Sequence, residues 1–389
     1  MQSWDLSAQL EGIKKQQLYR ARQVIDGPQG ARVTIDGQSY DNFSSNDYLG
    51  LANHPKIVTA FKGAVDDYGV GSGSAHLICG HSHEHHALEE ELAAFTGRER
   101  ALVFSTGYMA NLGAIAALVS KGDEVLQDKL NHASLIDGGL MSGAKFRRYP
   151  HANLARLQQL LEQSSAAKKL IVSDGVFSMD GDQADIQTLA AVAEQSASML
   201  MIDDAHGLGV LGETGAGVLQ QQGLNQQQVP ILMATFGKSL GTAGAFIAGS
   251  NDLIEILIQR ARSYIYSTAM PAAIMAATRV SLQLCQKDNW RREKLAALIA
   301  QFRRGAEQLG LTLMPSDTPI QPVILGSNQA VMQASENLKE NNILVGAIRH
   351  PTVPKNTERL RITLSASHTE AQVERLLLVL EGCCVDEVK

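Results

Sequence analysis

The feature that most constrains the fold is a series of short apolar runs that alternate with helical patterns between residues 100 and 250. Each run is almost continuously apolar, which is typical of strands covered on both faces. Between and before the runs, apolar residues recur at helical spacing over 87–95, 109–119 and 185–195. The strand candidates are 101–104, 123–126, 169–173, 199–203, 231–235 and 245–248. The pattern predicts an α/β domain with a mostly parallel sheet and helices on both faces.

Different patterns flank this stretch. Residues 1–30 predict a polar helix that ends at turn residues, and residues 31–43 predict a hairpin turned at Asp36 and Gly37. A long amphipathic helix over 291–309 begins a second, smaller α+β region. Its other strands and helices are expected near 320–325, 360–364, 329–341 and 369–381. We expect three parts: an N-terminal helix and hairpin segment at 1–45, a large domain at 46–285 and a small C-terminal domain at 286–389.

Charge and composition exclude several classes of partner. The 389 residues carry 34 Lys and Arg among 40 Asp and Glu, for a net charge of -6 and no basic block, so we expect neither nucleic acid nor membrane as a partner. The sequence has no run of 18 apolar residues and no signal-peptide pattern at its start. Its four cysteines lack CxxC spacing, which favours reduced thiols. These features predict a cytoplasmic protein.

Polar residues follow the ends of four of the predicted strands. Ligands of open α/β sheets bind outside the carboxyl ends of the strands, so these residues are the first candidates for chemistry. Asp203 closes one apolar run, His206 follows three residues later, and Lys238 lies among small residues after a later run. A pyridine-based cofactor needs a carboxylate for its ring nitrogen and a lysine for an imine. An Asp at a strand end is more often a turn or helix cap, so this prediction rests on the combination.

Two known phosphate-binding motifs do not match the sequence, but a third segment could bind phosphate through its backbone. Lys238 follows a glycine, but a P-loop also requires glycine five positions before Gly237, where the chain has Leu232. The glycine-rich stretch 69–80 lacks the spacing of a dinucleotide fingerprint. Residues 106–108 lie between a predicted strand and a predicted helix, where free backbone N–H groups bind phosphate. An ordinary strand-to-helix turn is the alternative interpretation there.

Four histidines crowd together at the start of a predicted helix and suggest a metal site. They contain no HExxH pattern, and no second cluster of ligands accompanies them. We therefore expect no metal, and we interpret the four as a polar helix start with packing or hydrogen-bonding side chains. The residues are His81, His83, His85 and His86.

Seven stretches of the sequence carry a family resemblance. They are FSSNDYLGL at 43–51, LNHASL at 130–135, GVFSMDGD at 175–182, DDAHGLGVLGETG at 203–215, TFGKSLG at 235–241, YSTAMP at 266–271 and AIRHPTVP at 347–354. Over almost the whole chain, the sequence resembles the α-oxoamine synthase family of fold-type-I pyridoxal phosphate enzymes. The resemblance implies a fold-type-I transferase that binds pyridoxal 5'-phosphate and forms a homodimer.

The resemblance also assigns roles to single residues. It implies that Lys238 forms the imine with the cofactor and moves the substrate Cα proton, that Asp203 pairs with the ring nitrogen, and that His132 stacks on the ring. His206 and Ser178 are expected to reach the phenolic oxygen of the ring. The residues expected to hold the cofactor phosphate are Gly107, Tyr108, Thr235 and, across a dimer interface, Thr268. The residues that match substrate contacts are Arg20, Asn46, His132, Arg349 and Thr352, of which Arg349 suits a carboxylate.

The activity implied by the resemblance is the decarboxylative condensation of an amino acid with an acyl thioester. L-Alanine and a pimeloyl thioester, on coenzyme A or on acyl carrier protein, are the leading expectation, which places the reaction in biotin biosynthesis; residues 320–326 and 347–354 favour it. Glycine with acetyl-CoA is the nearest alternative, because discrimination by one methyl group is worth only about 1–3 kcal/mol. A non-catalytic regulatory subunit is a third possibility, against which the presence of Lys238, Asp203, His206 and His132 argues.

Overall fold

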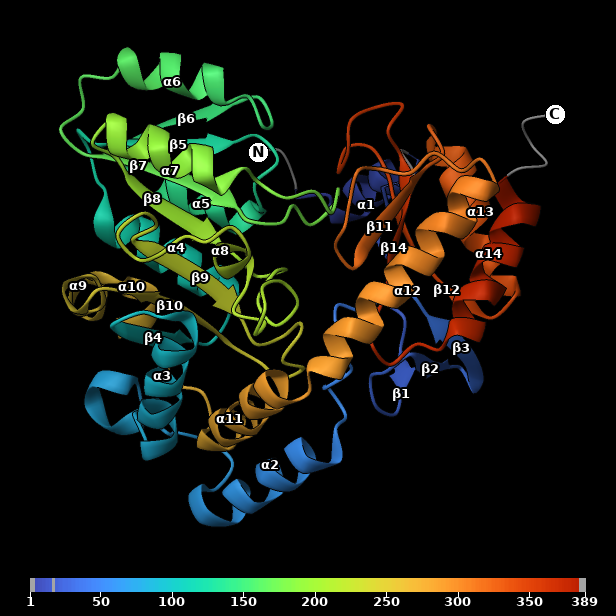
Figure 1. Ribbon diagram of the computed structural model, residues 1–389, viewed down its shortest axis with the longest axis horizontal. Coiled ribbons are helices and arrows are strands. Elements are labelled where there is room, and N and C mark those ends of the chain that lie inside the picture. The colour runs from blue at the N-terminus through green and yellow to red at the C-terminus, as the bar shows by residue number, and fades with distance from the viewer. Residues whose placement is uncertain (1–3, 16–17, 385–389) are drawn as a thin grey trace.

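The six predicted apolar runs form six of the seven strands of one sheet (Figure 1). The structure is a computed structural model that describes residues 4–15 and 18–384. In the order in which they lie in the sheet, the strands are β4 (Arg100–Phe104), β10 (Ala245–Gly249), β9 (Ile231–Thr235), β8 (Met199–Asp203), β7 (Lys169–Asp174), β5 (Glu124–Asp128) and β6 (Lys145–Tyr149). Within this sheet β10 alone runs against its neighbours, so the predicted mostly parallel sheet is confirmed.

Helices cover both faces of this sheet, as predicted. On β7, Leu170 and Val172 face one apolar cluster and Ile171 faces another, which follows from the alternation of side chains along a strand. The helices that pack on the face of Leu170 are α4 (Gly107–Leu118), α5 (Ala133–Met141) and α9 (Asn251–Arg260). The helices on the opposite face are α3 (His83–Thr96), α6 (Leu154–Glu162), α7 (Ile186–Gln195) and α11 (Ala272–Lys287).

The C-terminal region forms a second, smaller sheet that lies beside the large one (Figure 1). Its antiparallel strands, in order, are β11 (Ile320–Ile324), β14 (Arg359–Thr363) and β13 (Gly346–Ile348). Its helices are α12 (Asn289–Gln308), α13 (Asn328–Glu340) and α14 (Glu370–Cys384). The predicted α+β character of this region is therefore confirmed, including the long amphipathic helix that opens it.

The predicted hairpin joins the C-terminal region. Strands β2 (Arg32–Ile35) and β3 (Gln38–Asn42) are turned at Asp36 and Gly37, whose φ angles of 51° and 75° are those of a tight hairpin turn. β3 also pairs in parallel with β12 (Ile343–Leu344), so residues 302 positions apart share one sheet. β1 (Ile25–Asp26) completes that sheet on the other side of β2.

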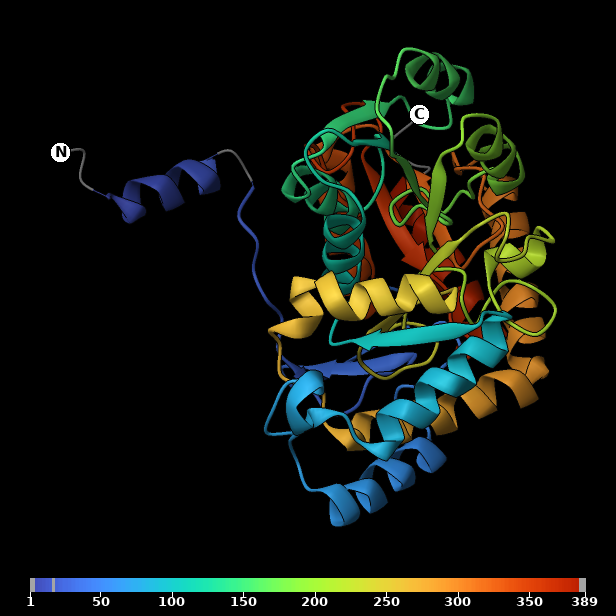
Figure 2. The ribbon, with the colours of Figure 1, turned by 90° about the vertical axis from the view of Figure 1, so that its left-hand side faces the viewer.

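The N-terminal helix is shorter than predicted. α1 (Leu6–Lys15) ends before the expected boundary near residue 30, and residues 18–24 are not helical. α1 buries no residue and projects away from the rest of the protein (Figure 2), so no tertiary packing extends it. Positions 1–3 and 16–17 of the predicted helix lie outside the described residues.

Four shorter or peripheral helices complete the chain. They are α2 (Pro55–Tyr68), the π-helix η1 (His76–Gly80), α8 (Val218–Gln221) and α10 (Arg262–Ile265). One apolar cluster includes Ile202 of β8 and Phe302 of α12, so the large and small regions share a core. The division of the chain at residues 46 and 286 stays a prediction. Across residues 4–15 and 18–384, no helix combines the length and apolar character that crossing a membrane requires.

Candidate functional site

The carboxyl ends of the parallel strands surround a cavity of about 190 Å³. Asp174 ends β7, Asp203 ends β8 and Thr235 ends β9, so their side chains meet at one edge of the sheet. Eight of the residues proposed from the sequence line this cavity. The full lining is Gly107, Tyr108, Asn111, His132, Ser134, Asp174, Ser178, Asp203, Ala205, His206, Met233, Thr235 and Lys238.

A chain of hydrogen bonds runs from Lys238 into the protein. Lys238 Nζ lies 2.8 Å from His206 Nε2, and His206 Nδ1 lies 2.6 Å from the hydroxyl of Tyr48. The Tyr48 hydroxyl donates to Asn46 Oδ1 at 3.2 Å. Because that hydroxyl has one proton, we assign a proton to His206 Nδ1, which leaves Nε2 to accept from Lys238. His206 is thereby fixed in one orientation at the cavity wall.

Burial sets the protonation of this pair. Burial, helped by the positive charge of Lys238, holds the pKa of His206 well below its ordinary value. Burial also lowers the pKa of Lys238 to about 8, although the carboxylates of Asp203 and Asp174 act in the opposite direction. A lysine with this pKa carries a substantial fraction of neutral amine near neutral pH, which is the nucleophilic form.

Asp203 is held in place by two hydrogen bonds at the floor of the cavity. Its Oδ1 accepts from the backbone N–H of Ala205 at 3.0 Å, and its Oδ2 accepts from Asn111 Nδ2 at 2.7 Å. Asn111 Nδ2 donates also to Ser134 Oγ at 2.9 Å. These donors fix the orientation of the carboxylate, which is the group that would pair with a protonated pyridine nitrogen. Sequence reasoning missed Asn111, because it lies mid-helix in an apolar stretch.

His132 lies at the N-terminus of α5, where its backbone N–H donates to Asp174 Oδ2 at 2.7 Å. Its Nδ1 lies 2.7 Å from Ser134 Oγ, which orients the ring at the cavity. Burial lowers the pKa of His132, so the ring is neutral at physiological pH. A neutral, oriented imidazole can stack on an aromatic ring, as the sequence led us to expect.

The start of α4 provides backbone N–H groups at the same cavity. The helix begins at Gly107, and Thr106 caps it by accepting from the N–H of Met109 at 3.1 Å. Tyr108 donates its hydroxyl to Asp137, whose hydrogen bond raises the pKa of Tyr108. Thr235 donates to the carbonyl of Gly244 at 2.8 Å. Uncapped N–H groups at a helix N-terminus bind phosphate, so this edge suits a phosphate group.

Arg361 is a second residue that the sequence did not indicate. It lies on β14, its Nε donates to the carbonyl of Ser178 at 2.6 Å, and its Nη atoms lie 3.3 Å from Asn46 Oδ1. The positive charge of Arg361 contributes to the lowered pKa values of His206 and Lys238, so Arg361 influences the electrostatics of the cavity. Its place within the predicted strand 360–364 was the available signal, since an arginine among apolar strand residues is rarely buried without a partner.

Five of the predicted site residues do not line this cavity, and one of them, Asn46, accepts hydrogen bonds from Tyr48 and Arg361. Arg349 lines a separate cavity of about 610 Å³ together with Tyr19, next to Arg20, and with residues of α13. The N–H of Thr352 donates to the carbonyl of Arg349 at 2.9 Å. Thr268 is exposed and forms a bridge with Ala75. The roles proposed for Arg20, Arg349, Thr352 and Thr268 stay predictions.

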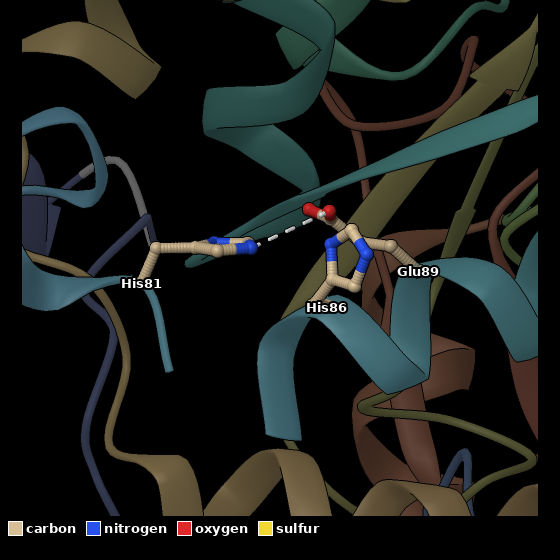
Figure 3. Close-up of side chains that lie close together, drawn as sticks. All are labelled: His81, His86 and Glu89. Atoms are coloured by element: carbon tan, nitrogen blue, oxygen red, sulfur yellow. Dashed lines mark ion pairs between the residues drawn. The ribbon is translucent and has the colours of Figure 1, made fainter. Parts of the chain in front are cut away.

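The four histidines before and within α3 are arranged in two ways. His85 forms a capping box with Ser82 and hydrogen-bonds the carbonyl of Met270 at 2.8 Å, so it is one of the expected hydrogen-bonding histidines at the helix start. His81 and His86, however, come close to Glu89, one turn along α3 from His86 (Figure 3). The sequence pattern did not predict this approach, because His81 belongs to the loop before the helix.

Comparison with known proteins identifies the class of protein. Residues 40–380 match the model of the family described as aminotransferase class I and II, so the chain belongs to that family. It is 58% identical, over 96% of its length and 94% of the relative, to 8-amino-7-oxononanoate synthase of Cellvibrio japonicus. It is 56% identical to that of Pseudomonas aeruginosa, over 97% of this chain and 94% of the relative. Within its family, the chain belongs with the 8-amino-7-oxononanoate synthases.

Solved structures agree with the predicted fold. Serine palmitoyltransferase from S. paucimobilis with a bound PLP-myriocin aldimine is 29% identical, with a TM-score of 0.92 over 97% of this chain and 96% of that one. The 8-amino-7-oxononanoate synthase of Francisella tularensis is 32% identical, with a TM-score of 0.79 over 90% of this chain and 98% of that one. The expected fold-type-I architecture and the family resemblance are therefore confirmed.

Proposed function

We propose that the protein condenses L-alanine with a pimeloyl thioester to give 8-amino-7-oxononanoate, CO2 and free thiol, with pyridoxal 5'-phosphate held on Lys238. The observation that carries the proposal is the donor set of one cavity: a buried lysine, a fixed carboxylate and a helix N-terminus. The high identity to synthases of this name supports the choice of substrates.

The residues fit pyridoxal phosphate by their chemistry. Lys238 supplies the amine, Asp203 the partner of the ring nitrogen, and the N–H groups at Gly107 and Tyr108 the phosphate site, together with Thr235. His132 is oriented to stack on the ring, and Ser178 and His206 line the wall where its phenolic oxygen would lie. When bound, the cofactor supplies a ring that accepts electrons from the substrate Cα and again after loss of CO2.

The reaction requires a base and an anchor for the amino acid. With the cofactor bound, Lys238 would be the base that takes the Cα proton, and its lowered pKa matches it to that task. The Cα would then attack the thioester carbonyl, and the sulfur would leave as a thiolate that takes a proton from solvent. The carboxylate departs as CO2, and Lys238 returns a proton to Cα. Arg361 and Asn46 lie where they can hold the alanine carboxylate before that loss.

The acyl substrate needs more room than the cofactor cavity provides. The cavity of about 610 Å³ that Arg349 and Tyr19 line is the candidate for the pimeloyl chain. The guanidinium of Arg349 suits the distal carboxylate of the pimeloyl group, and Arg20 and Thr352 are neighbouring polar residues.

A substrate screen tests the reaction. The purified protein loaded with pyridoxal phosphate is supplied with L-alanine, glycine or L-serine, together with pimeloyl-CoA, pimeloyl-acyl carrier protein or acetyl-CoA. We expect thiol release and a product of the mass of 8-amino-7-oxononanoate with L-alanine and a pimeloyl thioester. Turnover restricted to glycine and acetyl-CoA would leave the role of Lys238 intact and reject the biotin assignment.

We further propose that the protein is a cytoplasmic homodimer in which Thr268 completes the phosphate site of the partner. Thr268 is exposed, and α1 presents Leu6, Leu10 and Ile13 to solvent on one helical face. Cys79 and Cys285 are free thiols, in keeping with a reducing compartment.

Mixed dimers of Lys238→Ala and Thr268→Ala chains test the shared site. If Thr268 acts across the interface, one of the two sites in each mixed dimer has both residues intact, so mixing restores activity and cofactor affinity. If Thr268 acts within its own chain, no mixed dimer has an intact site, and activity stays at the level of the separate variants. A monomer in light scattering would reject the dimer itself.

A further inference from the structure

The second histidine arrangement lies outside the cavity of Lys238, on α3 and the loop before it. Ligand atoms of His81, His86 and Glu89 all lie within 4.8 Å of one another (Figure 3). His86 and Glu89 are three residues apart on α3, which places both side chains on one face of the helix. His81 reaches the same point from the segment that follows η1.

Neighbouring groups orient two of these three side chains. His81 Nδ1 lies 3.1 Å from Nδ1 of His76, which leaves Nε2 directed toward Glu89 Oε2 at 4.0 Å. Glu89 Oε1 accepts from the backbone N–H of Val103 at 2.9 Å, which directs Oε2 toward the two histidines. Hydrogen bonds on the far side of ligand groups are the usual supports of a metal site.

We propose that His81, His86 and Glu89 bind one divalent cation of the Zn²⁺ class, with water completing its coordination. Two imidazoles and one carboxylate are a ligand set that Zn²⁺ accepts, at about 2.0–2.2 Å from each atom. Tetrahedral geometry then needs the ligand atoms about 3.3 Å apart, so the cluster must contract by roughly 1.5 Å. The side chain of His86 is 65% exposed, so it can supply that movement, and it leaves an entry path for the ion.

The cation competes with Glu90 for His86, and its binding would connect two segments of the chain. His86 Nε2 lies 3.4 Å from Glu90 Oε1, an exposed ion pair of little energetic weight that the cation displaces. The ion ties the segment after η1 to α3. η1 connects that segment to Ala75, and Ala75 forms a bridge with Thr268. The cation therefore also stabilises the part of the chain that contacts Thr268.

Zinc titration of the chelator-treated holoenzyme tests the proposal. We expect one equivalent of Zn²⁺ per chain at this site by calorimetry, and a rise in the unfolding temperature that depends on zinc concentration. His81→Ala, His86→Ala and Glu89→Gln should each weaken binding at least tenfold. Glu89→Gln keeps the oxygen that accepts from Val103 and removes only the charged ligand, so it separates loss of the ion from loss of the fold.

Two variants serve as matched controls. His83 is an exposed histidine of the same helical turn and is absent from the cluster, so His83→Ala should bind zinc as the unmodified protein does. Cys79 is exposed in η1, and Cys79→Ser should also leave the affinity unchanged. The proposal is overturned if no zinc binds, if the three ligand variants retain the affinity, or if either control loses it.

Discussion

Covalent capture of pyridoxal phosphate by Lys238 should follow pH as the titration of a group with a pKa of about 8. At pH 7 about one tenth of such a lysine is neutral, whereas an ordinary lysine amine is about 0.03% neutral. The cavity therefore increases the reactive amine about 300-fold at neutral pH. The capture rate should rise tenfold per pH unit up to pH 7.5 and level off above pH 8.5.

Borohydride trapping of the adduct, followed by peptide mass analysis at each pH, measures this rate for Lys238 alone. N-acetyl-lysine amide is the unburied reference. Asp203→Asn should move the plateau to lower pH, because the carboxylate of Asp203 raises the pKa of Lys238, and Arg361→Gln should move it to higher pH, because that guanidinium lowers it. A rate that keeps climbing to pH 10, or shifts of the wrong sign in both variants, would refute the role assigned to burial.

Three other predictions follow from single contacts. Lys238→Ala should abolish turnover and leave circular dichroism unchanged; near-normal kcat would contradict the mechanism. Asn111→Ala removes the 2.7 Å hydrogen bond to the carboxylate of Asp203, which is worth about 1.5–3 kcal/mol. It should therefore lower kcat/KM about 10- to 150-fold in steady-state assays. An unchanged kcat/KM would show that Asn111 does not position Asp203 for catalysis. His151 is partly buried, which lowers its pKa, but bonds to Asp128 and Asp182 outweigh burial and raise it to about 10. Because the folded pKa is raised, its stabilisation is complete below pH 6.5 and is lost as the pH rises toward 10; the urea midpoints of His151→Gln and the unmodified protein should converge there.

The large sheet was predictable from sequence because its central strands are buried on both faces. In the segment 169–173, for example, the three central residues Leu170, Ile171 and Val172 are all apolar, which is typical of a short strand covered on both faces. β6 escaped prediction because an edge strand reads KFRRY, with only Tyr149 fully buried. The chemistry of Lys238, Asp203 and His206 followed from their positions after strands, and the cavity brings them together.

Contacts between distant segments were beyond local sequence reasoning. Asn46 and Arg361 are 315 residues apart, and Tyr48 and His206 are 158 apart, so no spacing rule relates them. The approach of His81 to Glu89 depends on the course of the chain through η1, a π-helix that periodicity does not indicate. The early end of α1 is explained by a missing contact: α1 packs against no other element, and a helical sequence pattern without a packing surface does not by itself extend a helix.

The parallel pairing of β3 with β12 sets an order of events during synthesis on the ribosome. Asp41 pairs with Ile343, and the carbonyl of Phe43 accepts from the N–H of Thr363, so the early hairpin has an open edge until β12 has emerged. At about 5–20 residues per second, translation of the intervening 300 residues takes on the order of 15–60 s. A nascent chain thus exposes an unpaired strand for far longer than a hairpin needs to form, which makes β3 the segment that a ribosome-associated chaperone would most usefully protect.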